Sequence, residues 1–262
     1  MKEGLFKRGK NQKGQVTIFV ILAIVIVVAG ILIYFYYPTI SSTSNSLEEN
    51  PKVYLQNCVE DVFLENTQIL SSQGGSMNPT QGFIYKGDKV EYLCYTNQYY
   101  DTCVVQKVSL ISNIEEELKL SLKQKVSECF SSMKADYEKK DYNPVLKNGD
   151  FSVDLLPKKI VLHSNSTLTL SKDSTVKYES FDVVLDNNLY ELASTARVIV
   201  NWEKNFGDSE VKLLMDWDPS IKVEKKLQSD GTKIYIVTDR NTEDKFQFAS
   251  RSVVWPPGIS TI

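Results

Sequence analysis

An uninterrupted apolar run, from Val16 to Tyr37, constrains this chain more than any other feature. It contains no charged residue and ends in a cluster of aromatic residues before Pro38. As a helix that rises 1.5 Å per residue, it would span about 33 Å, enough to cross the hydrocarbon core of a bilayer. We therefore expect a transmembrane helix over residues 16–37, with the lipid bilayer around it.

The segment before this run, residues 1–15, is a basic leader. Its one acid is Glu3, and its basic residues are Lys2, Lys7, Arg8, Lys10 and Lys13. The positive-inside rule predicts that this leader is cytoplasmic and that residues 38–262 lie outside. The apolar run is longer than the core of a cleaved secretory signal, roughly 7–15 residues, and no A-x-A exit site follows it. These features favour an uncleaved signal anchor.

Three residues, Lys13, Gly14 and Gln15, stand directly before the apolar run. With this arrangement the N-terminus, over residues 7–37, resembles the class III signal peptide of archaeal type IV pilin-like proteins. The resemblance implies cleavage after Gly14, a mature chain that begins at Gln15, and an apolar helix that forms a filament core. The chain departs from that family at Phe19, because the family carries Glu at the fifth residue of the mature chain.

All four cysteines follow the apolar run and so lie on the expected outer side, where an even count is typical of disulfides. Cys94 and Cys103 flank a short loop of polar and aromatic residues. Cys58 and Cys129 each fall on the apolar face of a predicted helix. We therefore predict the pairs Cys94–Cys103 and Cys58–Cys129. The alternative, a metal site, has no C-x-x-C pair, and the one histidine, His163, is distant in the sequence.

The next part of the chain is predicted to be helical. Residues 38–50 are polar and lack periodicity, which predicts a flexible linker. Apolar residues then recur at helical spacing over residues 51–74 and 108–137, and residues 81–95 read as a small β-hairpin between them. We expect a disulfide-linked helical hairpin with this β-hairpin, which together make up a helical region over residues 51–147.

Residues 148–262 are predicted to form a β-rich α+β region. Alternating or β-branched segments indicate strands, including one at residues 211–217, and their turns contain Pro157, Ser164–Asn165, Asp173–Ser174 and Ser229–Gly231. One helix interrupts the strands and begins near Asn188, where Glu191 would complete a capping box. The predicted fold class is α+β, with a mainly antiparallel sheet and one packed helix.

The residues with catalytic potential form no recognised motif. His163 lacks a G-x-S-x-G elbow, and the S-x-x-K pair Ser131 and Lys134 lacks its S-D-N and K-T-G partners. Asp216 and Asp218 supply two carboxylates, fewer than a calcium site usually needs. We predict no catalytic residue, no cofactor and no metal. Lysines and arginines number 30 against 33 acids and are interspersed with them, so nucleic acid is not an expected partner.

Two features of the outer region indicate surface sites. Asn165 begins an N-S-T sequon in a predicted turn, which indicates a glycosylation site on the outer side. Four tyrosines surround the Cys94–Cys103 loop, and tyrosine is favoured at recognition surfaces. The alternative is that these side chains pack on a sheet edge. The four are Tyr92, Tyr95, Tyr99 and Tyr100.

Most of the chain resembles uncharacterised single-pass membrane proteins of small-genome archaea. The resemblance rests on the succession LQNCVEDV, SQGG, the paired cysteines and NNLYELA, and it implies a compartment but no chemistry. We expect a protein of the cell membrane with an extracytoplasmic C-terminal domain that acts by binding or scaffolding at the cell envelope, not as an enzyme. The alternative is a pilin-like filament subunit, and an extracytoplasmic hydrolase has no supporting motif.

Overall fold

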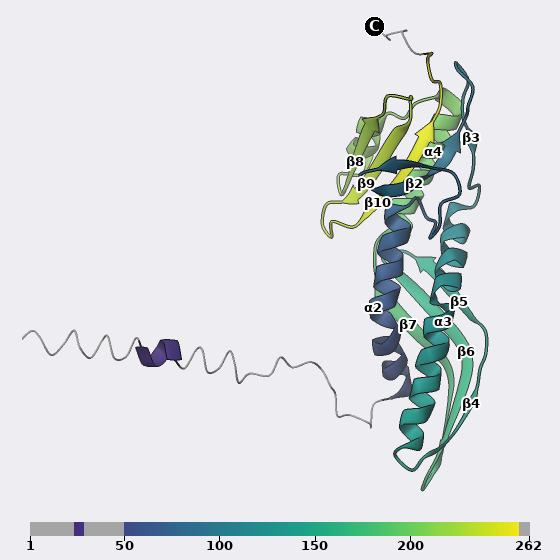
Figure 1. Ribbon diagram of the computed structural model, residues 1–262, viewed down its shortest axis with the longest axis vertical. Helices are drawn as coiled ribbons and strands as arrows, with labels where there is room; N and C mark the ends of the chain where they lie inside the picture. Colours follow the sequence, from purple (N-terminus) through teal and green to yellow (C-terminus); the bar gives the residue numbers. More distant parts are fainter. Residues whose placement is uncertain (1–23, 29–49, 257–262) are drawn as a thin grey trace, which may run out of the picture. The chain divides into compact units, whose positions relative to one another are not determined.

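The computed structural model of the chain describes residues 24–28 and 50–256 (Figure 1). Residues 24–28 are helical, and they are the described part of the span predicted at 16–37. Within the described part of the chain, none of the helices combines the length and the apolar character needed to cross a membrane. The leader predicted at 1–15 and most of the linker predicted at 38–50 lie outside the described residues.

The described residues from 50 to 256 form one compact unit, and the boundary expected after residue 147 falls inside it. One continuous core of buried side chains joins the helices of this unit with its two sheets. The fold class is α+β with antiparallel strand pairing and two disulfides, as predicted. The strands form two sheets, however, where the sequence indicated one.

Two long helices lie side by side in Figure 1: α2 (Pro51–Ser72) and α3 (Leu110–Glu138). They run in opposite directions, because contacts join the start of one to the end of the other. The Cys58–Cys129 disulfide links the first third of α2 to the last third of α3, and Asn66 Nδ2 donates to Ser121 Oγ at 3.1 Å further along. The predicted helical hairpin is therefore present, and its apolar faces are buried in the core.

The first sheet contains four antiparallel strands: β4 (Asn143–Lys147), β5 (Phe151–Leu156), β6 (Lys159–Ser171) and β7 (Thr175–Asp186). Strand β7 pairs with β6 along most of its length, whereas β5 and β4 lie end to end along the opposite edge of β6. Buried and exposed residues alternate along β5 and β6, as expected when one face of a sheet packs on a core. Helices α2 and α3 cover this sheet.

The turn predicted at Ser164–Asn165 is wrong, because β6 continues through it with a register shift between Ser164 and Thr167. The polar residues here bond to the loop before β5 and so do not reverse the chain. Ser166 Oγ accepts from Gly149 N at 3.1 Å, and the Asn165 amide donates to the Asp150 carbonyl at 3.0 Å. A Cβ on Gly149 would lie 2.5 Å from the Asn165 carbonyl carbon, so the close approach requires glycine.

The second sheet has the order β1-β2-β10-β9-β8, with β3 beside β2. Its strands are β1 (Gly82–Tyr85), β2 (Asp88–Tyr95), β3 (Val104–Val105), β8 (Ile221–Leu227), β9 (Lys233–Asp239) and β10 (Lys245–Arg251). The predicted β1–β2 hairpin and the predicted turn between β8 and β9 are both present. Strands β2 and β10 pair in parallel, so this sheet brings together segments that are far apart in the sequence.

Helix α4 (Leu189–Phe206) has the predicted apolar face, which is buried against the second sheet. The predicted capping box is wrong, because Asn188 makes no side-chain cap and instead donates to Asp239 and Thr242. Residues 211–217, predicted as a strand, form helix α5 (Val211–Trp217). Three apolar residues follow one another there, and the helical turn buries only the middle one, Leu214.

Candidate functional site

Both predicted disulfides are present, and the shorter one closes the segment that carries the candidate partner surface. Cys94 ends the buried part of β2 and pairs with Cys103, with 5.4 Å between their Cα atoms. Both cysteines are buried. We call the intervening residues 95–102 the disulfide loop. Its ends are fixed by a covalent bond in the core, so its exposed residues project from a rigid base.

The disulfide loop is also fastened to the chain that follows β10. The Tyr100 amide donates to the Val254 carbonyl at 2.9 Å, and the Val253 amide donates to the Asp101 carbonyl at 2.8 Å. Tyr99 and Val254 form an isolated parallel bridge. These backbone hydrogen bonds hold the disulfide loop against residues 253 and 254, near the described C-terminal end of the chain.

The structure divides the four predicted tyrosines into two pairs. Tyr99 and Tyr100 are 46% and 54% exposed, and the Tyr100 ring meets the ring of Trp255 edge-on at a centroid distance of 4.9 Å. Tyr92 is buried and Tyr95 is half-buried, and their ring centroids lie 4.8 Å apart. The predicted partner surface is therefore divided: Tyr99 and Tyr100 are exposed, whereas Tyr92 and Tyr95 lie in a hollow.

A β-bulge places Tyr92 and Tyr95 on the same face of β2. Residues three apart in a regular strand point to opposite faces. Here Tyr92 pairs with Ala249 while Cys94 pairs with Ser250, so β2 carries one additional residue opposite β10. As a result Leu93 and Cys94 both enter the main core, and both tyrosines join a separate cluster on the other face.

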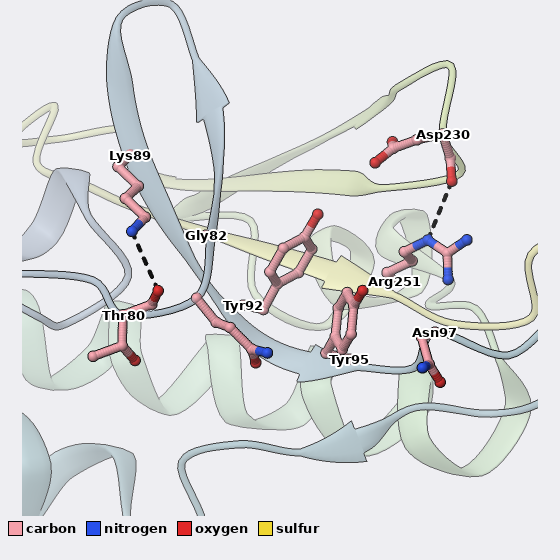
Figure 2. Close-up of a pocket in the computed structure, with 9 residues that line it drawn as sticks. Thr80, Gly82, Lys89, Tyr92, Tyr95, Asn97, Asp230 and Arg251 are labelled. Atoms are coloured by element: carbon pink, nitrogen blue, oxygen red, sulfur yellow. Dashed lines mark hydrogen bonds between the residues drawn. The ribbon is translucent and has the colours of Figure 1, made fainter.

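Tyr92 and Tyr95 line a pocket of 460 Å³, which we call the tyrosine pocket. In Figure 2 their rings lie between Lys89 on one side and Arg251 and Asn97 on the other. The remaining lining comes from the segment before β1, from the first residue of β1 and from the β8–β9 turn: Thr80, Gln81, Gly82 and Asp230. Most of these side chains are polar.

A second hollow, of 620 Å³, opens beside Trp255. Its rim carries Phe206 and Leu227, which are 76% and 72% exposed. We call Tyr99, Tyr100, Trp255, Phe206 and Leu227 the exposed apolar surface. Contiguous apolar patches on soluble domains mark interaction sites. The sequence alone did not point to Trp255 or Phe206, because nothing in their neighbourhood distinguishes them from tail or core residues.

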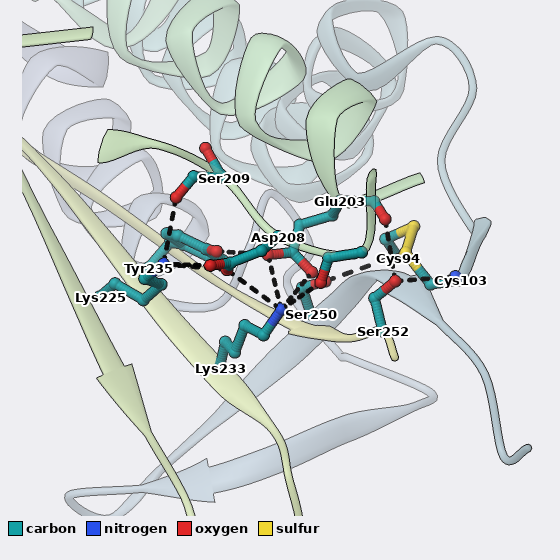
Figure 3. A network of polar contacts seen from close by, with 11 residues as sticks. Cys94, Cys103, Glu203, Asp208, Ser209, Lys225, Lys233, Tyr235, Ser250 and Ser252 are labelled. Carbon is teal, nitrogen blue, oxygen red and sulfur yellow. Dashed lines mark hydrogen bonds and ion pairs between the residues drawn. A yellow bond between two sulfur atoms is a disulfide. The ribbon is translucent and has the colours of Figure 1, made fainter. Parts of the chain in front are cut away.

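A buried network of polar side chains lies beneath the disulfide loop (Figure 3). Its centre is Glu203 on α4, which is fully buried and accepts with both carboxylate oxygens from Lys233 Nζ at 3.0 Å. The Tyr235 hydroxyl donates to Oε1 of Glu203, and Ser250 Oγ donates to Oε2 at 3.0 Å. Four side chains from α4, β9 and β10 thus satisfy one another's hydrogen-bonding groups in the interior.

The network reaches the disulfide through Ser252. Ser252 Oγ donates to the Glu203 carbonyl at 2.8 Å and accepts from the Cys103 amide at 3.0 Å. The one signal for it in the sequence is Glu203 itself, which falls on the apolar face of the predicted helix with Ala196, Ile199 and Val200. The network therefore sets the position of the disulfide loop on α4.

Burial is the largest influence on the pKa values in this network. It raises the pKa of Glu203 despite the opposing effect of Lys233, and it raises the pKa of Tyr235. Burial also acts to raise the pKa of Asp208, but hydrogen bonds and charge from Lys225 and Lys233 outweigh it, so that pKa is lowered. These groups bond to one another, and the arrangement stabilises the fold under the loop.

Other residues singled out in the sequence lie elsewhere. Asn165 is exposed on β6, while Gly14 and Gln15 lie outside the described residues. His163 is inside β6 and bonds through Nδ1 to Asp182 on β7, with Ser152 of β5 opposite it in register. His163, Asp182 and Ser152 lie on the face of the sheet that points away from the core. Ser152 Oγ donates to the neighbouring carboxylate of Asp154 at 3.4 Å.

No cluster of three or more histidine, cysteine, aspartate or glutamate side chains in the described ranges could hold a metal ion. Comparisons of the chain with known protein families, curated proteins and solved structures found no match.

Proposed function

We propose that this protein is a single-pass, membrane-anchored binding protein whose domain at residues 50–256 lies outside the cell and docks a protein partner on the exposed apolar surface. The observation that carries the proposal is the disulfide loop. A buried disulfide closes this loop, and backbone hydrogen bonds join it to residues 253–254. The buried ion pair of Glu203 and Lys233 lies below it, and the loop presents exposed aromatic rings. Rigid aromatic side chains bind at low cost in conformational entropy.

The outer location is supported by the cysteines and by the N-terminal sequence. All four cysteines are in disulfides, which persist in oxidising compartments. The basic leader and the apolar run predict that the domain follows a cytoplasmic N-terminus and one membrane crossing. A second candidate, a pilin-like filament subunit, is favoured by Lys13, Gly14 and Gln15 directly before the apolar run.

The anchor is tested on protein purified from its native membranes, by mass spectrometry of the N-terminal peptide. A chain that retains its leader supports the permanent anchor, and a chain that begins at Gln15 supports the pilin-like candidate. Protease added to intact cells should digest the C-terminal domain. If the domain is protected until the cells are lysed, its proposed outer location is wrong.

The docking surface is tested with a photo-crosslinking amino acid at Tyr100. The matched control is the same amino acid at Val176 on β7, which is 46% exposed against 54% for Tyr100. We expect one discrete crosslinked protein from position 100 and none from position 176. Equal crosslinking at both positions, or none at position 100, would contradict the proposed docking surface.

A further inference from the structure

The tyrosine pocket is separate from the exposed apolar surface and has its own chemistry. Several of its polar groups have no hydrogen-bond partner among the described residues. These groups are the Tyr95 hydroxyl, the Gln81 side-chain amide and Asn97 Nδ2. Gln81 precedes β1, whereas Tyr95 and Asn97 belong to the disulfide loop, and all three residues line one hollow.

The charged groups of the pocket are already bonded and act as fixed walls. Lys89 Nζ donates to the Thr80 carbonyl at 3.2 Å, and both carboxylate oxygens of Asp230 accept from Thr232 at 2.9 Å. Arg251 is held through Nε to the Asp230 carbonyl at 3.2 Å and through one terminal nitrogen to another carbonyl, which leaves its second terminal nitrogen for a ligand. A ligand in the pocket therefore meets neutral donors and acceptors together with the remaining N–H groups of Arg251 and Lys89.

The rings form the floor of the pocket. Tyr92 is fixed, because its hydroxyl is 2.7 Å from Thr232 Oγ1, and its ring lies beside that of Tyr95 at an interplanar angle of 57°. A volume of 460 Å³ is in the range, roughly 300–1,000 Å³, of small-molecule sites. Such sites usually have mostly apolar walls, whereas this one has aromatic rings below and polar groups around them.

We propose that the tyrosine pocket binds a saccharide. A sugar ring has a C–H face that packs on an aromatic ring and hydroxyl groups at its edge that exchange hydrogen bonds with amide, phenol and guanidinium groups. The pocket supplies both, through Tyr95 below and through Gln81, Asn97 and Arg251 at the rim. An apolar ligand would leave these rim groups unpaired, at a cost for each one buried.

The competing ligand classes fit less well. Phosphate groups are usually bound by several cations or by a run of backbone amides, whereas in this pocket Lys89 and Arg251 already donate to backbone carbonyls and the carboxylate of Asp230 is part of the lining. A metal ion would need oxygen ligands that are not already engaged, and Asp230 accepts with both of its oxygens. A folded protein partner fits the exposed apolar surface better than a concave polar hollow.

The test is isothermal titration calorimetry on the full chain in a detergent without sugar headgroups. The probes are neutral trisaccharides of glucose and mannose and a trisaccharide of galacturonate. We expect one of them to bind, and Tyr95→Ala and Gln81→Ala each to weaken binding by about tenfold, a change that corresponds to the loss of one good contact. The matched controls, Tyr178→Ala on β7 and Gln124→Ala on α3, lie outside the pocket lining and should change the Kd by less than about twofold.

A fold effect is separated from a binding effect with Tyr95→Phe, which keeps the ring and removes only the hydroxyl. Its circular dichroism spectrum should match that of the wild type while its binding is weakened. The proposal is overturned if no probe binds at millimolar concentration, or if binding is the same in the pocket variants as in the controls. Neither outcome bears on the anchor or on crosslinking at Tyr100, so failure here is distinguishable from failure of the proposed function.

Discussion

Glu203 on α4 and Lys233 on β9 form an ion pair in the protein interior, with 3.0 Å from the ammonium nitrogen to each carboxylate oxygen. The Lys233 side chain is 11% exposed and that of Glu203 is not exposed at all. The ammonium also lies 3.2 Å from Asp208 Oδ1. This pair fixes α4 to the sheet close to Ser252, which bonds to both the Glu203 carbonyl and the amide of Cys103 at the end of the disulfide loop.

We expect Glu203→Gln to lower the free energy of unfolding by about 3–5 kcal/mol, because the change leaves the Lys233 ammonium buried without its main counter-charge. Urea denaturation followed by circular dichroism measures this change. The matched control is Glu210→Gln, an exposed glutamate just before α5 whose loss should cost about 0.5 kcal/mol or less. Equal effects of the two substitutions would show that the buried pair does not stabilise the fold.

Glu91 gives the stability of the protein a specific dependence on pH. Burial is the largest influence on its pKa and raises it above the ordinary value of 4.5, although Lys107 at 3.5 Å acts to lower it. The folded protein therefore holds this proton to higher pH than the unfolded chain does. The stability that the folded protein gains from protonated Glu91 is fully present below pH 4.5 and is lost as the pH rises through the raised pKa of this carboxyl group.

The variant Glu91→Gln cannot ionise and should lose that dependence. The difference in unfolding free energy between Glu91→Gln and the wild type should therefore shift in favour of the variant as the pH rises from about 4 to about 8. Urea midpoints across this range measure it. Asp88→Asn, the same charge change at an exposed position of the same strand, is the control. A difference that stays constant with pH would contradict the raised pKa.

The two disulfides should contribute differently to stability. Cys58–Cys129 joins residues 71 apart in the sequence and Cys94–Cys103 joins residues 9 apart. Loop-closure entropy predicts losses of about 4 kcal/mol and about 3 kcal/mol when each pair is replaced by serine. Urea denaturation of the two double variants compares them. The reverse order would mean that strain or residual structure, and not loop length, determines their effect.

Gln56 on α2 protects the free edge of β7. Its side-chain amide donates to the Val184 carbonyl and accepts from the Val184 amide, both at 2.9 Å, as a neighbouring strand would. We expect Gln56→Ala to lower the unfolding free energy by about 1–2 kcal/mol and to promote association through the exposed edge. Denaturation and light scattering measure the two effects. Glu60→Ala, at an exposed position of α2, should show neither.

Periodicity within a segment was enough to predict much of this fold. The apolar faces of α2, α3 and α4 are buried as their spacing indicates, and the alternation in β5 matches its burial. The cysteine pairs followed from the same reasoning. Cys58 and Cys129 share the face on which their helices meet, and Cys94 and Cys103 flank one short loop.

Local patterns failed where a distant partner decides the conformation. Ser164 and Asn165 resemble a turn, but their bonding partners at Gly149 and Asp150 keep the strand continuous. Asn188 and Glu191 resemble a capping box, but each has another hydrogen-bond partner in the folded chain. In each case the competing contact comes from another part of the chain, so no property of the segment alone could reveal it.

The candidate site shows the same division. The sequence determined which residues surround the disulfide loop, because tyrosines and cysteines close together in the chain stay close in space. Only the tertiary structure decided that a bulge in β2 places the side chains of Tyr92 and Tyr95 on one face, where they line a pocket. It also decided that Trp255 packs against Tyr100 and that Glu203 lies beneath the loop. Side-chain spacing along a strand or helix is a local property, whereas pairing between β2 and β10 joins residues more than a hundred positions apart.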